Sequence, residues 1–446
     1  MDELPTPLIL EILNRVNDFT DIARCRLSSK ILNAVSYDVQ SLKLFCSYER
    51  YLKSKAAETK ASVTPYKSII LQVLQNLRNL DSVAVGVEKP FRGLIDEEVD
   101  DESDDLYLSD VNFVSEWLPG ISGGLKSLSI SDFWVQSFWR QSEVLSRISS
   151  YCHVLLDLEL KNAWLSVEGL KPMPMLTSLT LEYVRLDDED LEKVNQCFPS
   201  LRSLSLIGVG GLKEPKIHLL QLRTCHWTVS NAPLSLQIHA PNLVSLKLNC
   251  VKPRSLVLEA PLLSVLYLCI EGTDEFGLSC LCHLKSLRIE TADISIFVQL
   301  IQYGRTVKTL VVDSPKWGEL VEVDGEVGFG ALSSAFPNVC ALNLGPRAWS
   351  ALEMCFRMRC LNDASRMKDL KKLVAHLVLL DSGVTYSFIS SLLDQCTNLS
   401  EMALLVHRDV TVYVASQLKS RCMKDFPGIK WRWGMWKEET EDIWIS

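Results

Sequence analysis

The sequence predicts an α/β fold in which short parallel β-strands stack into a solenoid behind a small N-terminal helical segment. Three observations lead to this prediction. An apolar motif of the form L-x-x-L-x-L recurs along most of the chain, its copies from Leu201 to Leu399 begin 20 to 32 residues apart, and residues 1–38 break the pattern. A chain of 446 residues, 47% of them hydrophobic, can bury such an extended core, because each repeat packs only against its neighbours.

Residues 1–38 are predicted to form three short helices. The first covers LPTPLILEILNRV, in which apolar residues recur every four positions at Leu4, Leu8, Ile12 and Val16. Proline falls in its first turn, where the missing N–H costs nothing. TDIARCRLSSK, capped by Asp18 or Thr20, and KILNAVSYDV form the second and third helices. Three short helices cannot bury a stable core alone, so this segment must pack on the repeats or on another chain.

The repeated motif predicts the strands. Its clearest copies begin at Leu125, Leu155, Leu176, Leu201, Leu243, Leu263 and Leu284, and looser copies begin at Val39, Leu77, Leu222, Val307, Val339, Leu370 and Leu399. The final L-x-L alternates with a period of two, so both of its apolar side chains point into the core from a short strand. The spacing is that of leucine-rich repeats. The strands are therefore expected to form a parallel sheet on the concave face.

The length of each unit predicts what connects its strands. Longer units have room for helices at 142–152, 188–198 and 385–396. The units of 20 to 21 residues between 201 and 284 are too short for a helix and should hold loops or short strands. Proline-containing turns, such as APNL from Ala240 and APLL from Ala260, deliver the chain into the next strand.

Three parts follow from this pattern: a helical motif at 1–38, the solenoid at 39–430 and a C-terminal cap at 431–446. The run DEEVDDESDD at 96–105 holds eight acidic residues and is expected to be a solvated loop inserted in the solenoid, with docking of a basic partner as the alternative. The cap carries Trp431, Trp433, Trp436 and Trp444. Alternation at the first two predicts a final strand that closes the solenoid, and a binding surface is the alternative.

Composition and motifs disfavour several classes of protein. Without the eight acidic residues the net charge of −9 would be −1, so nothing indicates binding to nucleic acid. There is no signal peptide and no uncharged apolar run of 18 residues, which indicates an intracellular protein without a membrane span. Cys280, Cys282 and His283 lack the second cluster that a zinc site needs. With no phosphate loop, G-x-S-x-G or H-E-x-x-H motif, we expect neither catalysis nor a cofactor.

Residues 4–36, LPTPLILEILNRVNDFTDIARCRLSSKILNAVS, resemble an F-box. The match begins with Leu-Pro, continues through an apolar helix with Glu-Ile-Leu, and has Ser-Lys near its end. The family often has Trp just after Ser-Lys, where this chain has Ile31 and Leu32. An F-box followed by leucine-rich repeats is common among plant F-box proteins, and APNLVSLKL and APLLSVLYL are similar to their repeats. The resemblance covers nearly the entire chain.

The resemblance implies that the chain is a substrate-recognition subunit of an SCF-type E3 ubiquitin ligase in the nucleus or the cytoplasm. Its F-box would bind a Skp-type adaptor and, through it, a cullin scaffold. Carried over by position, the adaptor-binding residues would be Leu4, Pro5, Leu8, Ile9, Ile12, Leu13, Val16, Cys25, Leu27, Ser29 and Lys30. The alternatives are an interaction scaffold or a small-ligand sensor without a link to a ligase, and a plain apolar cap at the N-terminus.

A target is expected to bind the concave face. The residue between the last two apolar positions of each strand points out of that face, and four consecutive repeats place there His226, Lys247, Tyr267 and Arg288. Strands about 4.8 Å apart would align these side chains as one basic and aromatic stripe. Such a stripe suits an acidic or phosphorylated segment, since arginine offers a bidentate fork and tyrosine a flat anchor. The alternative is a solvated face partly neutralised by Glu182 and Glu290.

Overall fold

A computed structural model describes residues 4–16, 18–55, 62–87, 106–133, 140–229, 232–291, 294–313, 329–359, 367–438 and 440–445. The predicted acidic insert at 96–105 lies outside these residues. By their contacts the residues divide into two compact units, one of Met1–Pro233 with Gln237–Ala240 and one of Leu234–Leu236 with Pro241–Ser446.

The first unit begins with the three predicted helices, α1 (Thr6–Val16), α2 (Phe19–Ser28) and α3 (Lys30–Val35). Asp18 caps α2 by accepting hydrogen bonds from the backbone N–H of Thr20 at 2.9 Å and of Asp21 at 3.3 Å. The Asn14 side chain accepts a bond of 2.8 Å from the backbone N–H of Gln40, next to the first strand. The helices are thereby fixed to the start of the repeats.

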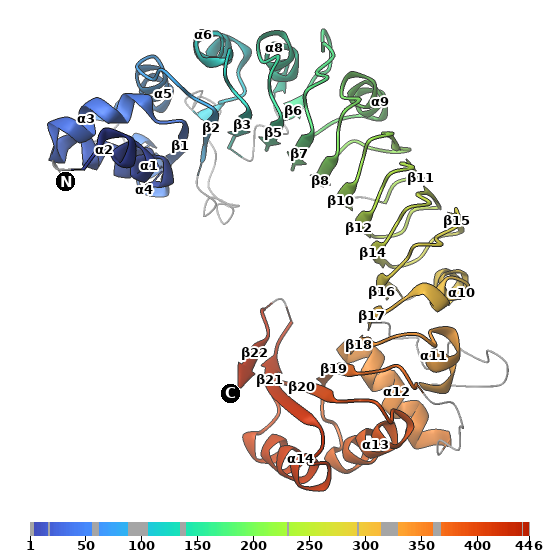
Figure 1. Ribbon diagram of the computed structural model, residues 1–446. Coiled ribbons are helices and arrows are strands. Elements are labelled where there is room, and N and C mark those ends of the chain that lie inside the picture. The colour runs from blue at the N-terminus through green and yellow to red at the C-terminus, as the bar shows by residue number, and fades with distance from the viewer. Residues whose placement is uncertain are drawn as a thin grey trace. The chain divides into compact units, whose positions relative to one another are not determined.

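Parallel strands form one side of the first unit, and most of the helices that connect them lie on the opposite side (Figure 1). The strands pair in the order β1 (Ser41–Cys46), β2 (Ser82–Val87), β3 (Ser127–Ser131), β5 (Asp157–Lys161), β7 (Ser178–Glu182), β8 (Ser203–Val209) and β10 (Thr224–Val229). The helices after α3 are α4 (Tyr48–Lys55), α5 (Tyr66–Leu74), α6 (Val111–Ile121), α8 (Val144–Tyr151) and α9 (Asp188–Cys197). Two short strands, β4 (Gln141–Ser142) and β6 (Trp164–Leu165), pair with each other.

One strand of this unit lies later in the sequence than predicted. The motif from Leu77 would place its strand near Leu80, but β2 begins at Ser82 and buries Val83 and Val85. Leu77 instead belongs to the turn that follows α5, where its N–H donates to the carbonyl of Leu74 at 3.2 Å. The true copy therefore starts three residues later, at the buried Leu80.

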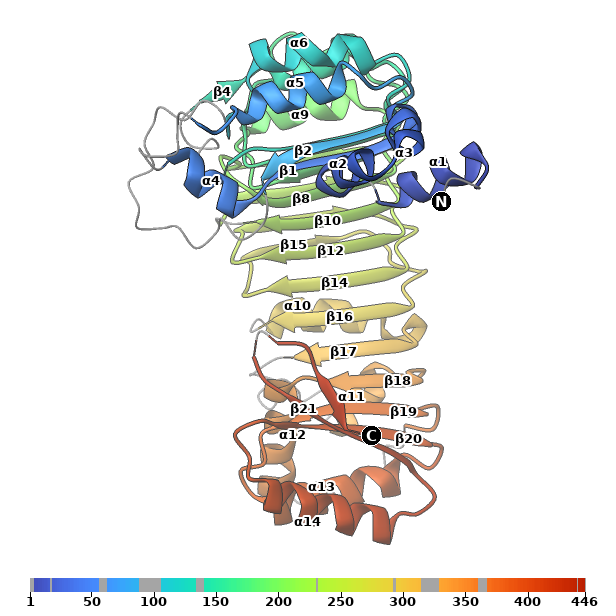
Figure 2. The ribbon, with the colours of Figure 1, turned by 90° about the vertical axis from the view of Figure 1, so that its left-hand side faces the viewer.

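The second unit repeats the arrangement. Figure 2 shows its strands side by side, in the order β12 (Ser245–Cys250), β14 (Val265–Ile270), β16 (Ser286–Thr291), β17 (Thr309–Asp313), β18 (Ala341–Leu344), β19 (Lys372–Leu377), β20 (Glu401–His407) and β21 (Lys430–Trp436). All of these pair in parallel, and β22 (Ile443–Ile445) returns antiparallel to β21. The helices are α10 (Ile294–Ile301), α11 (Phe329–Ala335), α12 (Pro346–Arg359), α13 (Ser382–Gln395) and α14 (Val412–Asp425).

Short outer strands replace helices in the short repeats, as predicted. They are β9 (Lys216–His218), β11 (Ser235–His239), β13 (Ser255–Glu259) and β15 (Glu275–Leu278). In the first unit Gln237–His239 pairs with β9, and in the second β13 pairs with β15. The leucine-rich-repeat solenoid predicted from the spacing is therefore the fold of the chain.

The tryptophan-rich C-terminal segment forms the predicted final strand. On β21, Trp433 and Trp436 are buried, and the Trp436 indole N–H donates to the carbonyl of Leu377 at 3.1 Å. The return strand β22 was not predicted. It brings Trp444 close to Gly434, and the Arg432 guanidinium lies 4.3 Å from the centre of the Trp444 ring. Two of the four tryptophans thus point inward at the end of the sheet.

Candidate functional site

Helix α1 carries apolar side chains on both of its faces. Ile9 and Leu13 are 2% and 1% exposed and anchor the helix to the chain. Leu4, just before the helix, and Leu8 and Ile12 within it are each four residues from the next and are 41%, 48% and 44% exposed. The last residue but one of α2, Leu27, is 91% exposed. These large apolar side chains are thus left accessible to solvent although the helix already packs on the chain through its other face.

The other predicted adaptor-binding residues divide between surface and structural positions. Pro5 and Lys30 are exposed, and Val16 and Cys25 are half-buried. Ser29 is the N-cap of α3, where its hydroxyl accepts a hydrogen bond of 3.2 Å from the backbone N–H of Ile31. Ile9, Leu13 and Ser29 therefore have roles within the chain itself. Ile31, which stands where F-box proteins often have tryptophan, keeps an apolar side chain exposed.

Three residues of the predicted target stripe lie side by side on the strand face of the second unit. Strand register aligns Lys247 with Tyr267 and Tyr267 with Arg288. The Lys247 ammonium lies 5.5 Å and the Arg288 guanidinium 4.6 Å from the centre of the Tyr267 ring. The tyrosine ring thus interacts with a cation from each neighbouring strand, which holds its flat surface in place.

The guanidinium of Arg288 already forms an ion pair with Glu290. Its carboxylate accepts bonds of 2.8 Å from Nε and 2.7 Å from Nη2 of Arg288. Burial raises the pKa of Tyr267 to about 12, and the charge of Glu290 adds to the effect. Burial and Glu290 likewise raise the pKa of Cys269 to about 11. Of the two neutralising residues that the sequence suggested, Glu290 pairs with the stripe and Glu182 pairs with Lys161 instead. Lys247 makes no ion pair within the described residues.

The fourth residue of the stripe belongs to the first unit. His226 on β10 is half-buried, aligns with Ser205 of β8, and has its Nε2 3.4 Å from the Thr228 hydroxyl.

A charged cluster that the sequence reasoning missed lies on the strand face of the first unit. The Lys161 ammonium lies 2.8 Å from a carboxylate oxygen of Glu159 and 2.9 Å from one of Glu182. The Ser129 hydroxyl donates to Glu159 at 2.6 Å. Of the second outward positions, only those of Glu182 and Glu290 were considered in the sequence, and Lys161 occupies this position on β5. Reading both positions would have revealed the cluster.

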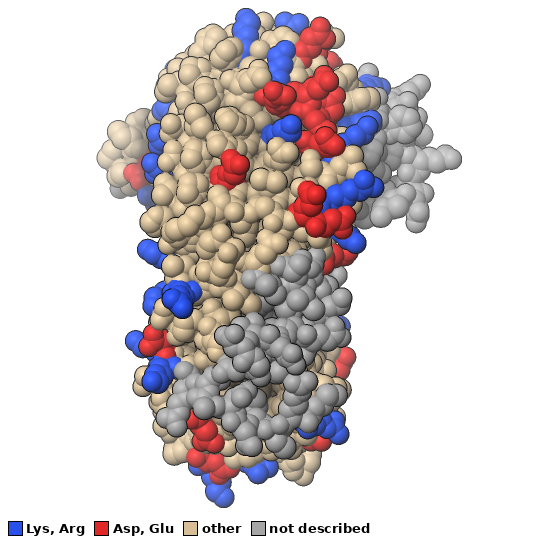
Figure 3. Space-filling model, turned by 90° about the vertical axis from the view of Figure 1, so that its right-hand side faces the viewer, with Lys and Arg blue, Asp and Glu red and all other residues tan. Residues whose placement is uncertain are grey.

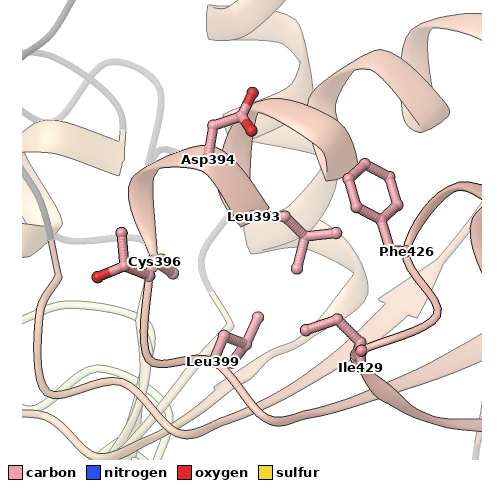
Figure 4. Close-up of a pocket in the computed structure, with 8 residues that line it drawn as sticks. Leu393, Asp394, Cys396, Leu399, Phe426 and Ile429 are labelled. Carbon is pink, nitrogen blue, oxygen red and sulfur yellow. The ribbon is translucent and has the colours of Figure 1, made fainter.

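A small pocket of about 250 Å³ lies between the ends of α13 and α14 (Figure 4). Its walls are mostly apolar, with Leu393, Leu399, Phe426 and Ile429 around it, and the carboxylate of Asp394 points away. Within the described residues, no three metal-ligating side chains come together. Cys280 and Cys282 are joined in a disulfide, so their sulfurs are not free to bind zinc.

The outer side of the repeats carries its charges along the margins and is largely uncharged in the middle (Figure 3). No broad basic surface of the kind that binds nucleic-acid backbones is visible on the described part of this face. In the described residues, every helix is too short or too polar to span a bilayer.

Comparison with known proteins agrees with the architecture. No family model matches the chain. An F-box/LRR-repeat protein of Arabidopsis thaliana is 46% identical to it over 450 residues, and the match covers 100% of both chains.

Proposed function

The chain belongs to the F-box/LRR-repeat proteins, and on this premise we propose that it is the substrate-recognition subunit of an intracellular SCF-type E3 ubiquitin ligase. In this proposal the helices α1 to α3 bind a Skp-type adaptor, which connects the chain to a cullin scaffold. The repeats bind the target protein. The chain contributes binding surfaces, and the ubiquitin-conjugating machinery performs the chemistry.

The outward apolar row of α1 is the observation that carries the proposal. Leu4, Leu8 and Ile12 are roughly half exposed although Ile9 and Leu13 already fix the helix to the chain. Each large apolar side chain contributes about 1.5–3 kcal/mol when it is fully buried. Leu4, Leu8 and Ile12, together with the exposed Leu27 of α2, would supply much of the free energy of binding to an adaptor.

Co-purification with a Skp-type adaptor tests the proposal. The double variant Leu8→Asp/Ile12→Asp should lose the adaptor, while its melting temperature stays near that of the wild type because both side chains point into solvent. Leu380→Asp is the matched control, since Leu380 is 89% exposed but lies in the second unit. This variant should retain the adaptor.

Two outcomes of this co-purification would contradict the proposal. If the double variant binds as well as the wild type, the outward face of α1 is not the adaptor site. If the wild type itself does not bind any Skp-type adaptor, the ligase role is wrong, and a scaffold or a small-ligand sensor is the better description.

For the target we propose the part of the predicted stripe that lies in the second unit, Lys247, Tyr267 and Arg288, which would bind an acidic or phosphorylated segment. Support comes from the cation–ring–cation arrangement around Tyr267 and from Lys247, which makes no ion pair within the residues that the structure describes. Because Glu290 holds Arg288 in place, Lys247 and the Tyr267 ring are the groups most ready to contact a ligand. Arg288 would contribute a fixed positive charge beside them.

Peptide arrays with acidic, phosphorylated and neutral members provide the test. Lys247→Glu/Arg288→Glu should abolish capture of acidic members by like-charge repulsion, while Lys308→Glu, another exposed lysine of the second unit, should leave it unchanged. Equal capture by the double variant and the wild type would remove this stripe from the proposal without affecting adaptor binding.

A further inference from the structure

Two exposed cysteines flank the turn that leads into β16. Cys280 and Cys282 are joined by a disulfide, and Leu281 between them is fully buried. Both cysteines are exposed, whereas the free cysteines in the described part of the chain are buried or half-buried. Small solutes can therefore reach this pair of sulfurs more readily than the other described cysteines.

The same turn occurs one repeat earlier with a different restraint. The N–H of Leu284 donates to the carbonyl of Leu281 at 3.2 Å, as the N–H of Leu263 donates to the carbonyl of Ala260 at 3.1 Å. Counted from these leucines, Cys282 stands where the preceding repeat has Pro261. Pro241 has this position one repeat further back.

The disulfide can thus replace proline as the restraint on the turn. Proline fixes φ and reduces the number of conformations that an unfolded turn can adopt. A short disulfide loop restricts the same segment through a covalent bond. Unlike proline, this restraint can be removed by reduction.

The surroundings favour exchange at this pair over the other cysteines. Burial raises the pKa of the Cys225 and Cys250 thiols to about 12, so these remain protonated as well as shielded. Two residues with basic side chains, His283 and Lys285, follow Cys282 closely and are exposed. A basic, accessible environment is where thiolates form and react.

We propose that Cys280 and Cys282 form a reversible thiol–disulfide site that exchanges with low-molecular-weight thiols and disulfides and so restrains or releases the turn before β16. On oxidation, the thiolate of one cysteine attacks a small disulfide RSSR, forming a mixed disulfide and releasing RS⁻. The second cysteine, as thiolate, attacks the protein sulfur of the mixed disulfide, closes the Cys280–Cys282 bond and releases the second RS⁻. Two electrons pass from the cysteines to RSSR, and their two protons give two RSH. Reduction by two RSH is the reverse.

When the disulfide is reduced, the first backbone hydrogen bonds to open should be those at the start of β16. The N–H groups of Lys285 and Ser286 both donate to the carbonyl of Ser264, at 2.9 and 3.0 Å. These bonds tie the turn to the strand before it. Loss of a three-residue covalent loop should raise the rate of local opening on the order of tenfold. Arg288 and Glu290 follow on the same strand, so the state of the pair would also affect the rigidity of the strand face.

A redox titration followed by mass spectrometry tests the exchange. The full chain is equilibrated in glutathione buffers from fully reduced to fully oxidised, then denatured and alkylated. The tryptic peptide 255–285 contains Cys280, Cys282 and also Cys269. We expect the pair to change together from two free thiols to a disulfide, while Cys269 remains free in every native sample. Two free thiols in fully oxidised glutathione, or a mixed disulfide that never closes, would overturn the proposal.

Hydrogen exchange tests the effect on the turn. Reduced wild type should exchange the amides of 281–286 on the order of tenfold faster than oxidised wild type. Cys282→Pro, which restores the residue of the preceding repeats, should exchange at one rate in both buffers. Equal exchange in the two states of the wild type would leave the turn without redox control. Adaptor co-purification is expected to be the same in all samples, so failure here is distinguishable from failure of the ligase proposal.

Discussion

Asp132 is a fully buried carboxyl group in the first unit. It accepts hydrogen bonds from the backbone N–H of Leu108 at 2.5 Å, from that of Ser109 at 2.9 Å and from the Ser109 hydroxyl. Burial nevertheless raises its pKa from an ordinary 3.8 to about 7, because loss of hydration outweighs these bonds and the attraction of Lys67. The group therefore makes the stability of the first unit depend on pH.

Asp132→Asn should remove that dependence. Between about pH 4 and pH 7 the folded protein holds a proton on Asp132 that the unfolded chain has lost, so the free energy of unfolding of the wild type falls as pH rises through this window. The fall amounts to about 1.4 kcal/mol for each unit of pKa difference. Urea unfolding at a series of pH values measures it. The variant, which cannot ionise there, should gain stability relative to the wild type towards pH 7, and a constant difference would contradict the expectation.

Glu290→Gln should make Cys269 more reactive. The negative charge of Glu290 contributes, after burial, to the raised pKa of the Cys269 thiol. Without this charge the pKa falls, so a larger fraction of the thiol is ionised near pH 9 and alkylation should accelerate several-fold. The rate of labelling at Cys269 is the measurement, with Glu275→Gln as an exposed control in the same unit. An unchanged rate would mean that burial alone sets this pKa.

At the residue scale, the sequence predicts which side chains lie on the strand face but not the contacts that they make there. A period of two predicts which side chains of a strand face outward, and register then aligns Lys247, Tyr267 and Arg288. The sequence could not show which face of α1 packs against the chain, because apolar residues lie on both faces of this helix. Ile9 and Leu13 turned out to face inward, while Leu8 and Ile12 face out.

At the scale of elements, α9 shows how local sequence fixes a helix. The Asp187 side chain accepts a bond of 2.8 Å from the backbone N–H of Asp190, and the Asp190 side chain accepts one of 3.3 Å from the N–H of Asp187. This reciprocal cap satisfies two backbone donors that the first turn leaves without partners.

Asp187→Ala should therefore destabilise the first unit by about 1 kcal/mol. Asp187→Ser keeps an oxygen that can cap the helix and should recover most of the loss. Thermal or urea unfolding of the two variants beside the wild type is the measurement. If serine and alanine were equally destabilising, the charge of Asp187 rather than its capping bond would be the source of the stability.

Most elements were predictable because the repeats impose a pattern that sequence can show. The long units and the helix-free short units follow from motif spacing, and the last parallel strand follows from the alternation of Trp431 and Trp433. The exceptions have physical reasons. At β2 a leucine in a turn imitated the first position of the motif, and β22 is only three residues long, too short for alternation to be recognised.

At the scale of the whole molecule, each repeat within a unit should stabilise mainly the repeats next to it. Deletion of residues 430–446 removes β21 and β22 and would leave Ala403 and Leu405 of β20, both fully buried, at an open edge. Amide exchange in β20 should then rise on the order of tenfold or more, while β12 and β14 change little. Exchange that rises equally in all strands of the second unit would show that this unit unfolds as one cooperative body instead.

The number of parallel strands in the second unit also sets the length of a ligand that could cross all of them. Eight of them, β12 to β21, each present one outward position per register line, at a spacing of about 4.8 Å. Seven such steps cover about 34 Å, which an extended peptide spans with roughly ten residues. Binding of a ligand that lies across the strands would thus depend on the ligand's length as well as on its charge. Shorter segments would contact only some of the strands, and insertion of one repeat would lengthen the preferred ligand by one or two residues.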